Sequence, residues 1–238
     1  MIYKLKILAA FLVFVIVLAI ITANVMAFQF NGSDQSARDF FQPLNVPFRI
    51  EKIQHEGQTI RYVETGLQKP NSPLILFIHG APGSWGAFKG YLADYELKQV
   101  ARLISMDRLG YGNSNRGQAV TDIKKHVEAA LAIINRYEAS EVYIVGHSYG
   151  GPIVGNLAAN YPNQIKGALM IAPLIDPDNE PVRWYAHLCN LKILRPFLPA
   201  YINVATKEKM THSQALENIS NDWSKIEVPV IHLSLIHI

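Results

Sequence analysis

The chain has 238 residues, of which 50% are hydrophobic and 17% charged, and its formal net charge is +3. This length suits one domain with an extension, and the apolar fraction is enough for a sizeable buried core. The lysines and arginines are scattered and form no basic stripe, so we expect no nucleic-acid partner. The single cysteine, Cys189, excludes an internal disulfide framework and a cysteine-containing metal cluster, and we expect neither a metal nor another cofactor.

The N-terminal segment is almost entirely apolar. Residues 7–21 carry no polar side chain, and the apolar stretch continues to residue 28 with only Thr22 and Asn24 as interruptions. As a helix, residues 7–28 would extend roughly 33 Å at about 1.5 Å per residue, enough to cross the core of a bilayer. A helix that is apolar on all sides has no face to give to solvent, so we expect this segment to contact lipid.

Two lysines set the expected orientation of this segment. Lys4 and Lys6 precede the apolar residues, and positive charge favours the cytoplasmic side. Residues 1–28 are therefore expected to form a single-pass membrane anchor, with the folded domain on the extracytoplasmic side. The alternative is a signal segment that is cleaved near Val25-Met26-Ala27, but the apolar run exceeds the usual length of such segments.

The next part of the chain predicts a linker and then a sheet. Residues 29–45 contain Asn31-Gly32-Ser33-Asp34 and Pro43, which are typical of a linker. Residues 48–53 and 59–64 alternate apolar and polar side chains, the pattern of an antiparallel hairpin. Four later runs are apolar without alternation, which is typical of strands buried on both faces of a mostly parallel sheet: residues 74–78, 103–106, 142–145 and 167–171.

Helical patterns lie between these apolar runs. Within residues 121–134, apolar side chains recur at the i, i+4 and i+7 spacing of one buried face, and Thr121 suits an N-cap. A second helix is expected over residues 152–159, ended by Tyr161-Pro162. Alternating strands and helices predict an α/β fold in which helices cover both faces of the sheet.

One turn carries a candidate nucleophile. Gly146-His147-Ser148-Tyr149-Gly150 follows the strand at 142–145 directly and precedes the second helix. In such a G-x-S-x-G turn, the serine hydroxyl projects from the sharp corner between strand and helix. Glycine is needed on both sides because a Cβ there would collide with the crowded corner, and the strained serine is kept for function. Ser148 is therefore the candidate nucleophile.

Two further strands end in turns at the same edge of the sheet. His79-Gly80-Ala81-Pro82-Gly83 follows residues 74–78 and exposes backbone N–H groups, as an oxyanion hole requires. Asp107-Arg108-Leu109-Gly110-Tyr111-Gly112-Asn113-Ser114 follows residues 103–106. In order and spacing, these turns and the Ser148 turn together resemble the α/β-hydrolase family, from about Phe48 to the end of the chain.

This resemblance implies the fold and several roles. Residues 46–238 would form an α/β-hydrolase domain, a mostly parallel sheet flanked by helices, with residues 176–225 inserted as a small helical lid over the site. Ser148 would attack a carbonyl carbon, and the backbone N–H groups of Ala81 and Tyr149 would stabilise the oxyanion. Asp107-Arg108 would organise the neighbouring turns, while His79 and His147 would be structural.

The resemblance also implies a catalytic acid and a histidine after the lid. Residues 228–233 suit the strand that follows the lid, and the chain then stops, so we expect the triad partners beyond its end and a domain that is incomplete and inactive. Asp176 is an alternative position for the acid. No remaining histidine occupies the expected position of the base: His187, His212, His232 and His237.

The expected function is that of a membrane-anchored serine hydrolase. Epoxide hydrolases and haloalkane dehalogenases of this family use an aspartate as nucleophile, so Ser148 favours carboxylic esters and an acyl-enzyme intermediate. The expected partners are a small-molecule ester and, through residues 7–28, the lipid bilayer. The alternative is a non-catalytic binding protein of the same fold at the membrane, because a fold alone does not settle function.

Overall fold

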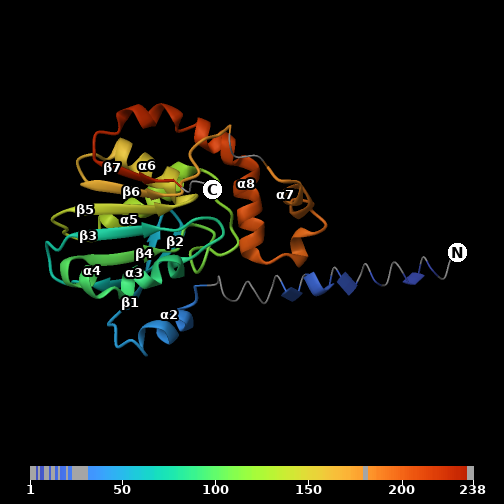
Figure 1. Cartoon of the computed structure of the whole chain (residues 1–238), viewed down its shortest axis with the longest axis horizontal. Helices are drawn as coiled ribbons and strands as arrows, with labels where there is room; N and C mark the ends of the chain where they lie inside the picture. The colour runs from blue at the N-terminus through green and yellow to red at the C-terminus, as the bar shows by residue number, and fades with distance from the viewer. Residues whose placement is uncertain are drawn as a thin grey trace.

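The computed structural model describes residues 32–178 and 182–234, together with scattered positions between 4 and 22. Its described residues contain a seven-stranded sheet with strand order β1-β2-β4-β3-β5-β6-β7 (Figure 1). The hairpin β1–β2 is antiparallel and also pairs antiparallel with β4, whereas the other pairs are parallel. The strands are β1 (Arg49–His55), β2 (Gln58–Gly66), β3 (Leu74–Ile78), β4 (Arg102–Met106), β5 (Val142–His147), β6 (Gly167–Ile171) and β7 (Val230–Leu233).

The sheet confirms the expected strands and hairpin. Side chains of β3 alternate between two cores: Leu76 joins the cluster beneath α5 (Ile123–Ile134) and α6 (Gly150–Asn160), whereas Phe77 joins the cluster on the opposite face. Three elements cover that opposite cluster: α2 (Asp34–Phe41), the 3-10 turn η1 (Trp85–Phe88) and α3 (Lys89–Ala93). Helix α4 (Tyr95–Val100) comes directly after α3 in the chain. Helices therefore cover both faces of the sheet, as an α/β fold requires.

The interpretation of residues 29–45 as a linker is wrong for the part that forms α2. The Ser33 hydroxyl accepts a hydrogen bond from the Ser36 N–H at 3.0 Å and thereby caps this helix. Phe41 is fully buried and packs against the rings of Phe48 and Trp85, with centroid distances of 5.1 and 5.7 Å. This helix is held by burial of its apolar face and belongs to the domain.

The predicted N-cap of α5 is also corrected, by one residue. The Asp122 side chain, and not that of Thr121, accepts the hydrogen bond from the Lys124 N–H, at 2.9 Å. A carboxylate at this position satisfies an otherwise unpaired N–H and also interacts favourably with the helix dipole.

The predicted anchor, residues 7–28, lies largely outside the described residues. Those positions of this segment that are described are helical, and their apolar side chains are exposed, including Phe11 and Phe14 at 62% each. Among all described residues, no helix combines the length and apolar character needed to cross a bilayer.

Residues 176–225 lie in the connection between β6 and β7 and form several helices joined by turns where the structure describes them, and we refer to them as the lid segment. It contains α7 (Trp184–Cys189), η2 (Arg195–Phe197), α8 (Ala200–Glu217) and η3 (Ser220–Lys225). Helices α7 and α8 lie together at one end of the sheet (Figure 1).

Candidate active site

Ser148 occupies a strained turn between β5 and α6. Its φ is +52°, in the left-handed region that a residue with a Cβ rarely adopts. Three backbone hydrogen bonds hold this conformation. The Ser148 N–H donates to the Ile171 carbonyl at 3.0 Å, and the Ser148 carbonyl accepts from the Gly151 N–H at 2.9 Å and from the Leu174 N–H at 3.2 Å. The surroundings thus fix the serine at the corner, as the motif predicts.

The glycines on either side of Ser148 are required by close packing. A Cβ on Gly146 would lie 2.4 Å from the Gly150 carbonyl oxygen, and a Cβ on Gly150 would lie 2.2 Å from the Ile78 carbonyl oxygen. Both distances are far inside van der Waals contact. The steric reason given for the motif is confirmed.

Ser148 faces open space and not the packed interior. It is half-buried and lines a cavity of about 330 Å³, together with His147 and the turn after β3. That turn touches the serine, because a Cβ on Gly80 would lie 2.8 Å from the Ser148 Cβ. Within the described part of the chain, no acceptor receives a hydrogen bond from the Ala81 or Tyr149 backbone N–H. Both N–H groups therefore remain candidates for the oxyanion donors.

The peptide group that carries the Ala81 N–H is fixed from its carbonyl side. The Gly80 carbonyl oxygen accepts hydrogen bonds from His79 Nδ1 at 2.6 Å and from Arg108 Nη2 at 3.2 Å. His79 Nε2 accepts from the Arg108 backbone N–H at 3.0 Å, so its proton resides on Nδ1. Burial and the Arg108 charge lower the pKa of His79 well below its usual value. His79 is therefore a structural residue, as expected, and not a base.

Arg108 is clamped by a lid residue that the sequence did not reveal. Its Nη1 and Nη2 donate to Glu208 Oε1 and Oε2 at 2.7 and 3.1 Å, and the Tyr111 hydroxyl donates to Oε2 at 2.6 Å. Arg108 and Glu208 are fully buried, and the guanidinium carbon lies 4.4 Å from the centre of the Tyr149 ring. Arg108 thus links α8 to both candidate oxyanion donors.

Asp107 organises the turns after β3 and β4. Its carboxylate accepts hydrogen bonds from the Trp85 N–H at 2.8 Å and the Asn113 N–H at 3.0 Å, and it faces Arg61 at 3.4 Å. Burial raises the pKa of Asp107 to about 6, against the opposing effect of Arg61. Gly112 is required beside it, because a Cβ there would lie 2.2 Å from the carboxylate. The role expected for Asp107-Arg108 agrees with these contacts.

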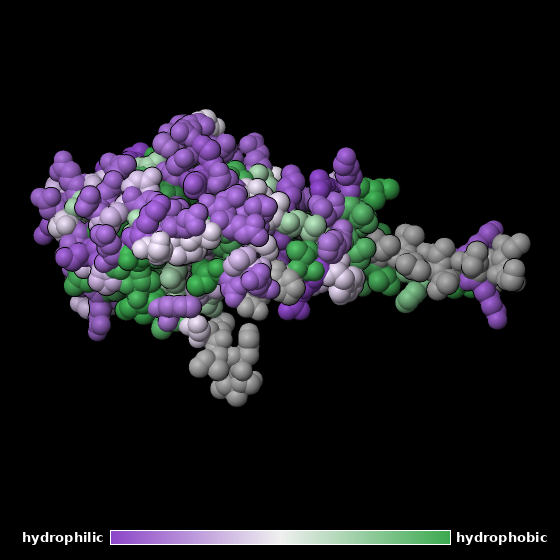
Figure 2. Space-filling view, turned by 90° about the horizontal axis from the view of Figure 1, so that it is seen from above, coloured by the Kyte–Doolittle hydropathy of each residue, from purple (hydrophilic) through white to green (hydrophobic). Residues whose placement is uncertain are grey.

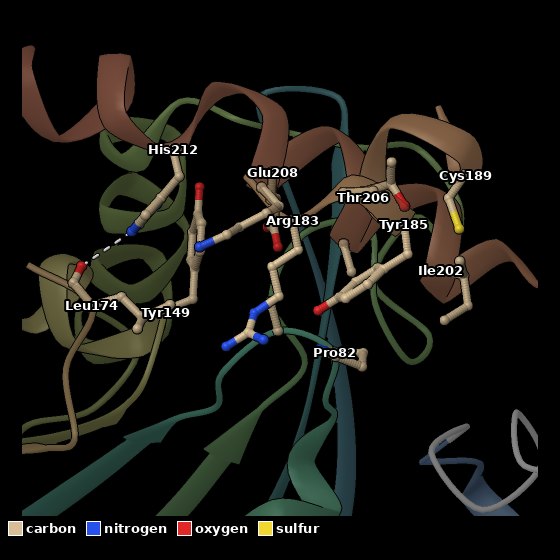
Figure 3. Close-up of a pocket in the computed structure, with 14 residues that line it drawn as sticks. Pro82, Tyr149, Leu174, Arg183, Tyr185, Cys189, Ile202, Thr206, Glu208 and His212 are labelled. Carbon is tan, nitrogen blue, oxygen red and sulfur yellow. Dashed lines mark hydrogen bonds between the residues drawn. The ribbon is translucent and has the colours of Figure 1, made fainter. Parts of the chain in front are cut away.

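A second cavity, of about 420 Å³, lies between the lid segment and the turn after β3, residues 79–83, which we call the candidate oxyanion turn. Ala81 and Pro82 border this cavity and the one that contains Ser148. Arg183 and Tyr185 point from the lid segment toward the space near Pro82 (Figure 3). The remaining lining is mostly apolar, so the cavity suits an apolar substrate group with one polar end.

The described structure does not bring a histidine base to Ser148. His212 is buried, its Nε2 lies 3.2 Å from the Leu174 carbonyl oxygen, and its ring stacks near Tyr149. His147 is adjacent to Ser148 and is exposed to solvent. The part of its ring that is shielded from water lowers its pKa below the usual value. Among the described residues, no hydrogen bond joins the Ser148 hydroxyl to either ring.

Asp176 lies two residues after Leu174, whose N–H donates to the Ser148 carbonyl at 3.2 Å. The Asp176 carboxylate accepts from the Asp178 N–H at 3.0 Å. His187 and His232 are exposed, on α7 and β7, and His237 lies outside the described residues. No group of His, Cys, Asp and Glu in the described residues has the arrangement of a metal site.

Comparison with known proteins identifies the family. A family model described as alpha/beta hydrolase fold matches residues 73–190, which include all the turns discussed above. The chain belongs to the α/β-hydrolase fold family, whose matched members are hydrolases.

Two curated relatives have different named activities. Epoxide hydrolase B of Mycobacterium tuberculosis is 27% identical over 122 residues, covering 49% of this chain and 33% of that protein. The Arabidopsis thaliana protein named "Probable lysophospholipase BODYGUARD 4" is 30% identical over 118 residues, covering 49% of this chain and 28% of that protein. The matched part of the chain spans about a third of the length of these relatives.

A solved structure extends the likeness over most of the chain. The crystal structure of a membrane phospholipase A, a bacterial virulence factor, has a TM-score of 0.59 and 19% sequence identity. The match covers 94% of this chain and 81% of the phospholipase chain. At this identity the likeness concerns the fold alone.

Proposed function

We propose that this protein is a serine hydrolase that cleaves carboxylic esters through an acyl-enzyme intermediate on Ser148. The observation that carries the proposal is the left-handed Ser148, half-buried in a cavity next to the free N–H groups of Ala81 and Tyr149. A nucleophile and a pair of N–H donors at one corner are the minimum that acyl transfer needs.

The proposed reaction has two halves. Ser148 Oγ attacks the carbonyl carbon, the carbonyl oxygen becomes an oxyanion held by the two N–H groups, and each donor contributes about 3 kcal/mol in the transition state. The tetrahedral intermediate then expels the alcohol, which takes up the serine proton, and leaves an ester on Ser148. Water attacks that ester in the second half and releases the acid.

The serine distinguishes this proposal from the activity named for the curated relative. Opening an epoxide with an aspartate forms an ester, which water can cleave at the carbonyl carbon. The same attack by Ser148 would form an ether, which has no carbonyl for water to attack and which the oxyanion donors could not activate. We therefore extend to this chain the hydrolysis of esters and not of epoxides.

We further propose that residues 7–28 anchor the protein in a bilayer as a single pass, with the hydrolase domain on the extracytoplasmic side. The apolar composition of this segment and the position of Lys4 and Lys6 before it support the proposal. The exposure of its described apolar side chains, such as Phe11 and Leu18, is consistent with lipid contact.

The direct test is to trap the acyl-enzyme. The full chain in detergent is incubated with p-nitrophenyl acetate or with a fluorophosphonate, and the modified residue is found by peptide mass spectrometry. We expect modification at Ser148, slow because no base among the described residues contacts it, yet faster than at other serines because the oxyanion donors remain. The acetyl group should persist, since its hydrolysis also needs a base.

The matched control is Ser148→Ala, which should lose the modification completely. Modification that is absent from the wild-type chain, or equal in Ser148→Ala, would contradict the catalytic proposal and favour the non-catalytic binding protein. Styrene oxide serves as the competing substrate, and its conversion to the diol would favour the epoxide hydrolase activity instead.

A further inference from the structure

The lid segment exposes a group of large apolar side chains around α7, which we call the lid patch. Trp184 is 75% exposed and Ile193 is 76% exposed, although both are of residue types that folding normally buries. The patch consists of Trp184, Tyr185, Leu188, Leu191, Ile193 and Phe197. A contiguous apolar surface of this kind marks an interaction site.

Within residues 182–207, which contain the lid patch, the charged side chains have one sign. Residues 182–207 contain no aspartate or glutamate, and their charged side chains are Arg183, Lys192, Arg195 and Lys207. Such a surface would not attract another basic face. It is complementary to the phosphate groups of anionic lipids, to which each basic residue near the membrane contributes about 1 kcal/mol.

The composition of the patch matches the layers of a bilayer surface. Tryptophan and tyrosine prefer the headgroup region, where an apolar ring and a polar tip are both accommodated. Leucine, isoleucine and phenylalanine are the side chains that interfacial elements insert at the acyl boundary. Trp184 and Tyr185 are adjacent in α7, and Leu191 and Ile193 follow in the next turn.

The position of the patch agrees with the same partner. Helix α7 lies at the end of the domain toward which the described N-terminal residues project (Figure 1). Apolar side chains gather at that end in the perpendicular view (Figure 2). This placement of α7 is compatible with a membrane partner for the lid patch.

We propose that the lid patch docks on the surface of an anionic lipid bilayer. The 420 Å³ cavity opens beneath this patch, because Arg183, Tyr185 and Cys189 line it from α7 and its N-terminal flank. Resting on the proposed function, this inference identifies the substrate class as an ester with a long apolar group, which passes from the lipid layer into the cavity without crossing water.

The test uses Trp184 as its own reporter. The other tryptophans, Trp85 and Trp223, are 1% exposed and partly buried. The full chain is mixed with vesicles of phosphatidylcholine and phosphatidylglycerol whose acyl chains carry bromine, which quenches tryptophan fluorescence on contact. We expect quenching with the wild-type chain, loss of most of it in Trp184→Phe, and weaker quenching when phosphatidylglycerol is omitted.

Two further variants separate docking from attachment through the N-terminus. Leu191→Glu with Ile193→Glu should abolish the quenching of Trp184, whether the chain inserts in the vesicle or adsorbs to it. The matched control is Val100→Glu in α4, where a side chain that is 60% exposed lies away from the lid patch, and quenching should be unchanged.

Equal quenching in the wild-type chain and in Trp184→Phe would overturn the proposal. So would cross-linking of patch residues between two copies with no quenching, because the occupant would then be a second copy of the chain. The outcome for the function is read separately from the modification of Ser148, which uses soluble probes. Quenching without modification would retain the docking surface and reject the hydrolase.

Discussion

At the scale of single residues, the arrangement of the site depends on Arg108. This one side chain contacts the Gly80 carbonyl, the Tyr149 ring and Glu208 of the lid segment. A hydrogen bond from a charged donor is stronger than one from a neutral donor, so Arg108 fixes the plane of the Gly80–Ala81 peptide firmly. Glu208 then acts as a positioning residue, because it holds the guanidinium in place from α8.

The prediction at this scale is that Glu208→Gln disturbs the oxyanion turn. Labelling with [13C]carbonyl glycine and [15N]alanine selects the Gly-Ala pairs, which occur at 80–81, 86–87 and 167–168. In nuclear magnetic resonance spectra of the full chain in detergent, we expect the Gly80–Ala81 signal to shift in this variant. The other two signals should stay in place and serve as internal references.

A matched variant tests whether loss of any buried ion pair has the same effect. Glu64 is buried and pairs with Arg102 and Tyr137 away from the oxyanion turn. Glu64→Gln should destabilise the protein to a comparable degree, because removing one partner of a buried pair costs about 3–5 kcal/mol. It should leave the Gly80–Ala81 signal unmoved. An unmoved signal in Glu208→Gln as well would remove Glu208 from the site.

At the scale of elements, the packing of α6 against η3 depends on a missing side chain. A Cβ on Gly155 in α6 would lie 2.0 Å from the Trp223 ring in η3. The backbone of α6 at Gly155 and the ring of Trp223 are thus closer together than a residue with a Cβ at position 155 would allow. The contact joins the helix behind Ser148 to the far end of the lid segment.

Gly155→Ala is therefore expected to destabilise the fold by about 1–3 kcal/mol, the usual effect of overpacking a core. The matched control is Gly90→Ala in α3, where a Cβ meets nothing within 4 Å. That change should be neutral or stabilising by about 0.5–1 kcal/mol, since alanine is the better helix former. Urea unfolding of both variants measures the difference. Equal stability of the two would show that Trp223 moves aside freely.

At the scale of the whole molecule, buried histidines set a dependence of stability on pH. His126 is fully buried in α5, and burial together with the Arg108 charge lowers its pKa to about 3. An unfolded histidine takes up a proton near pH 6.5. Between these values the unfolded state binds more protons, so stability rises with pH and is lost on acidification.

We expect His126→Gln to flatten this dependence. The wild-type free energy of unfolding should fall by up to about 1.4 kcal/mol per pH unit more than that of the variant between pH 6 and 4. The raised pKa of Asp107 acts in the opposite direction over part of this range, but it is present in both proteins and cancels in the comparison. Parallel curves from urea unfolding would contradict the lowered pKa of His126.

Local patterns made most of the fold predictable from the sequence. The strands, the hairpin and the Ser148 turn follow from two-residue alternation, apolar runs and glycine at crowded corners. Helix α2 was missed because its turn-forming neighbours, Gly32 and Pro43, dominate the local signal, while its support comes from Phe48 and Trp85. Local sequence does not report such packing.

The site was only partly predictable for the same reason. Ser148 follows from the glycine turn after β5, and the family resemblance implies the roles of Ala81 and Tyr149. Glu208, by contrast, lies 100 positions after Arg108. The available signal was an acidic residue on the buried face of α8, four residues from both Val204 and His212. The periodicity of α8 does not show that Arg108 is the partner of Glu208. Among the described residues, the contacts of Ser148 do not identify its base.

The buried pair of Arg108 and Glu208 decides how a substrate can enter. Swinging α8 outward would separate two fully buried charges and leave Arg108 without its carboxylate partner, so we expect α8 to stay in place. Helix α7 has no such restraint, since Ala186 is its only buried side chain. We therefore expect any opening of the cavity to involve movement of α7 more than movement of α8.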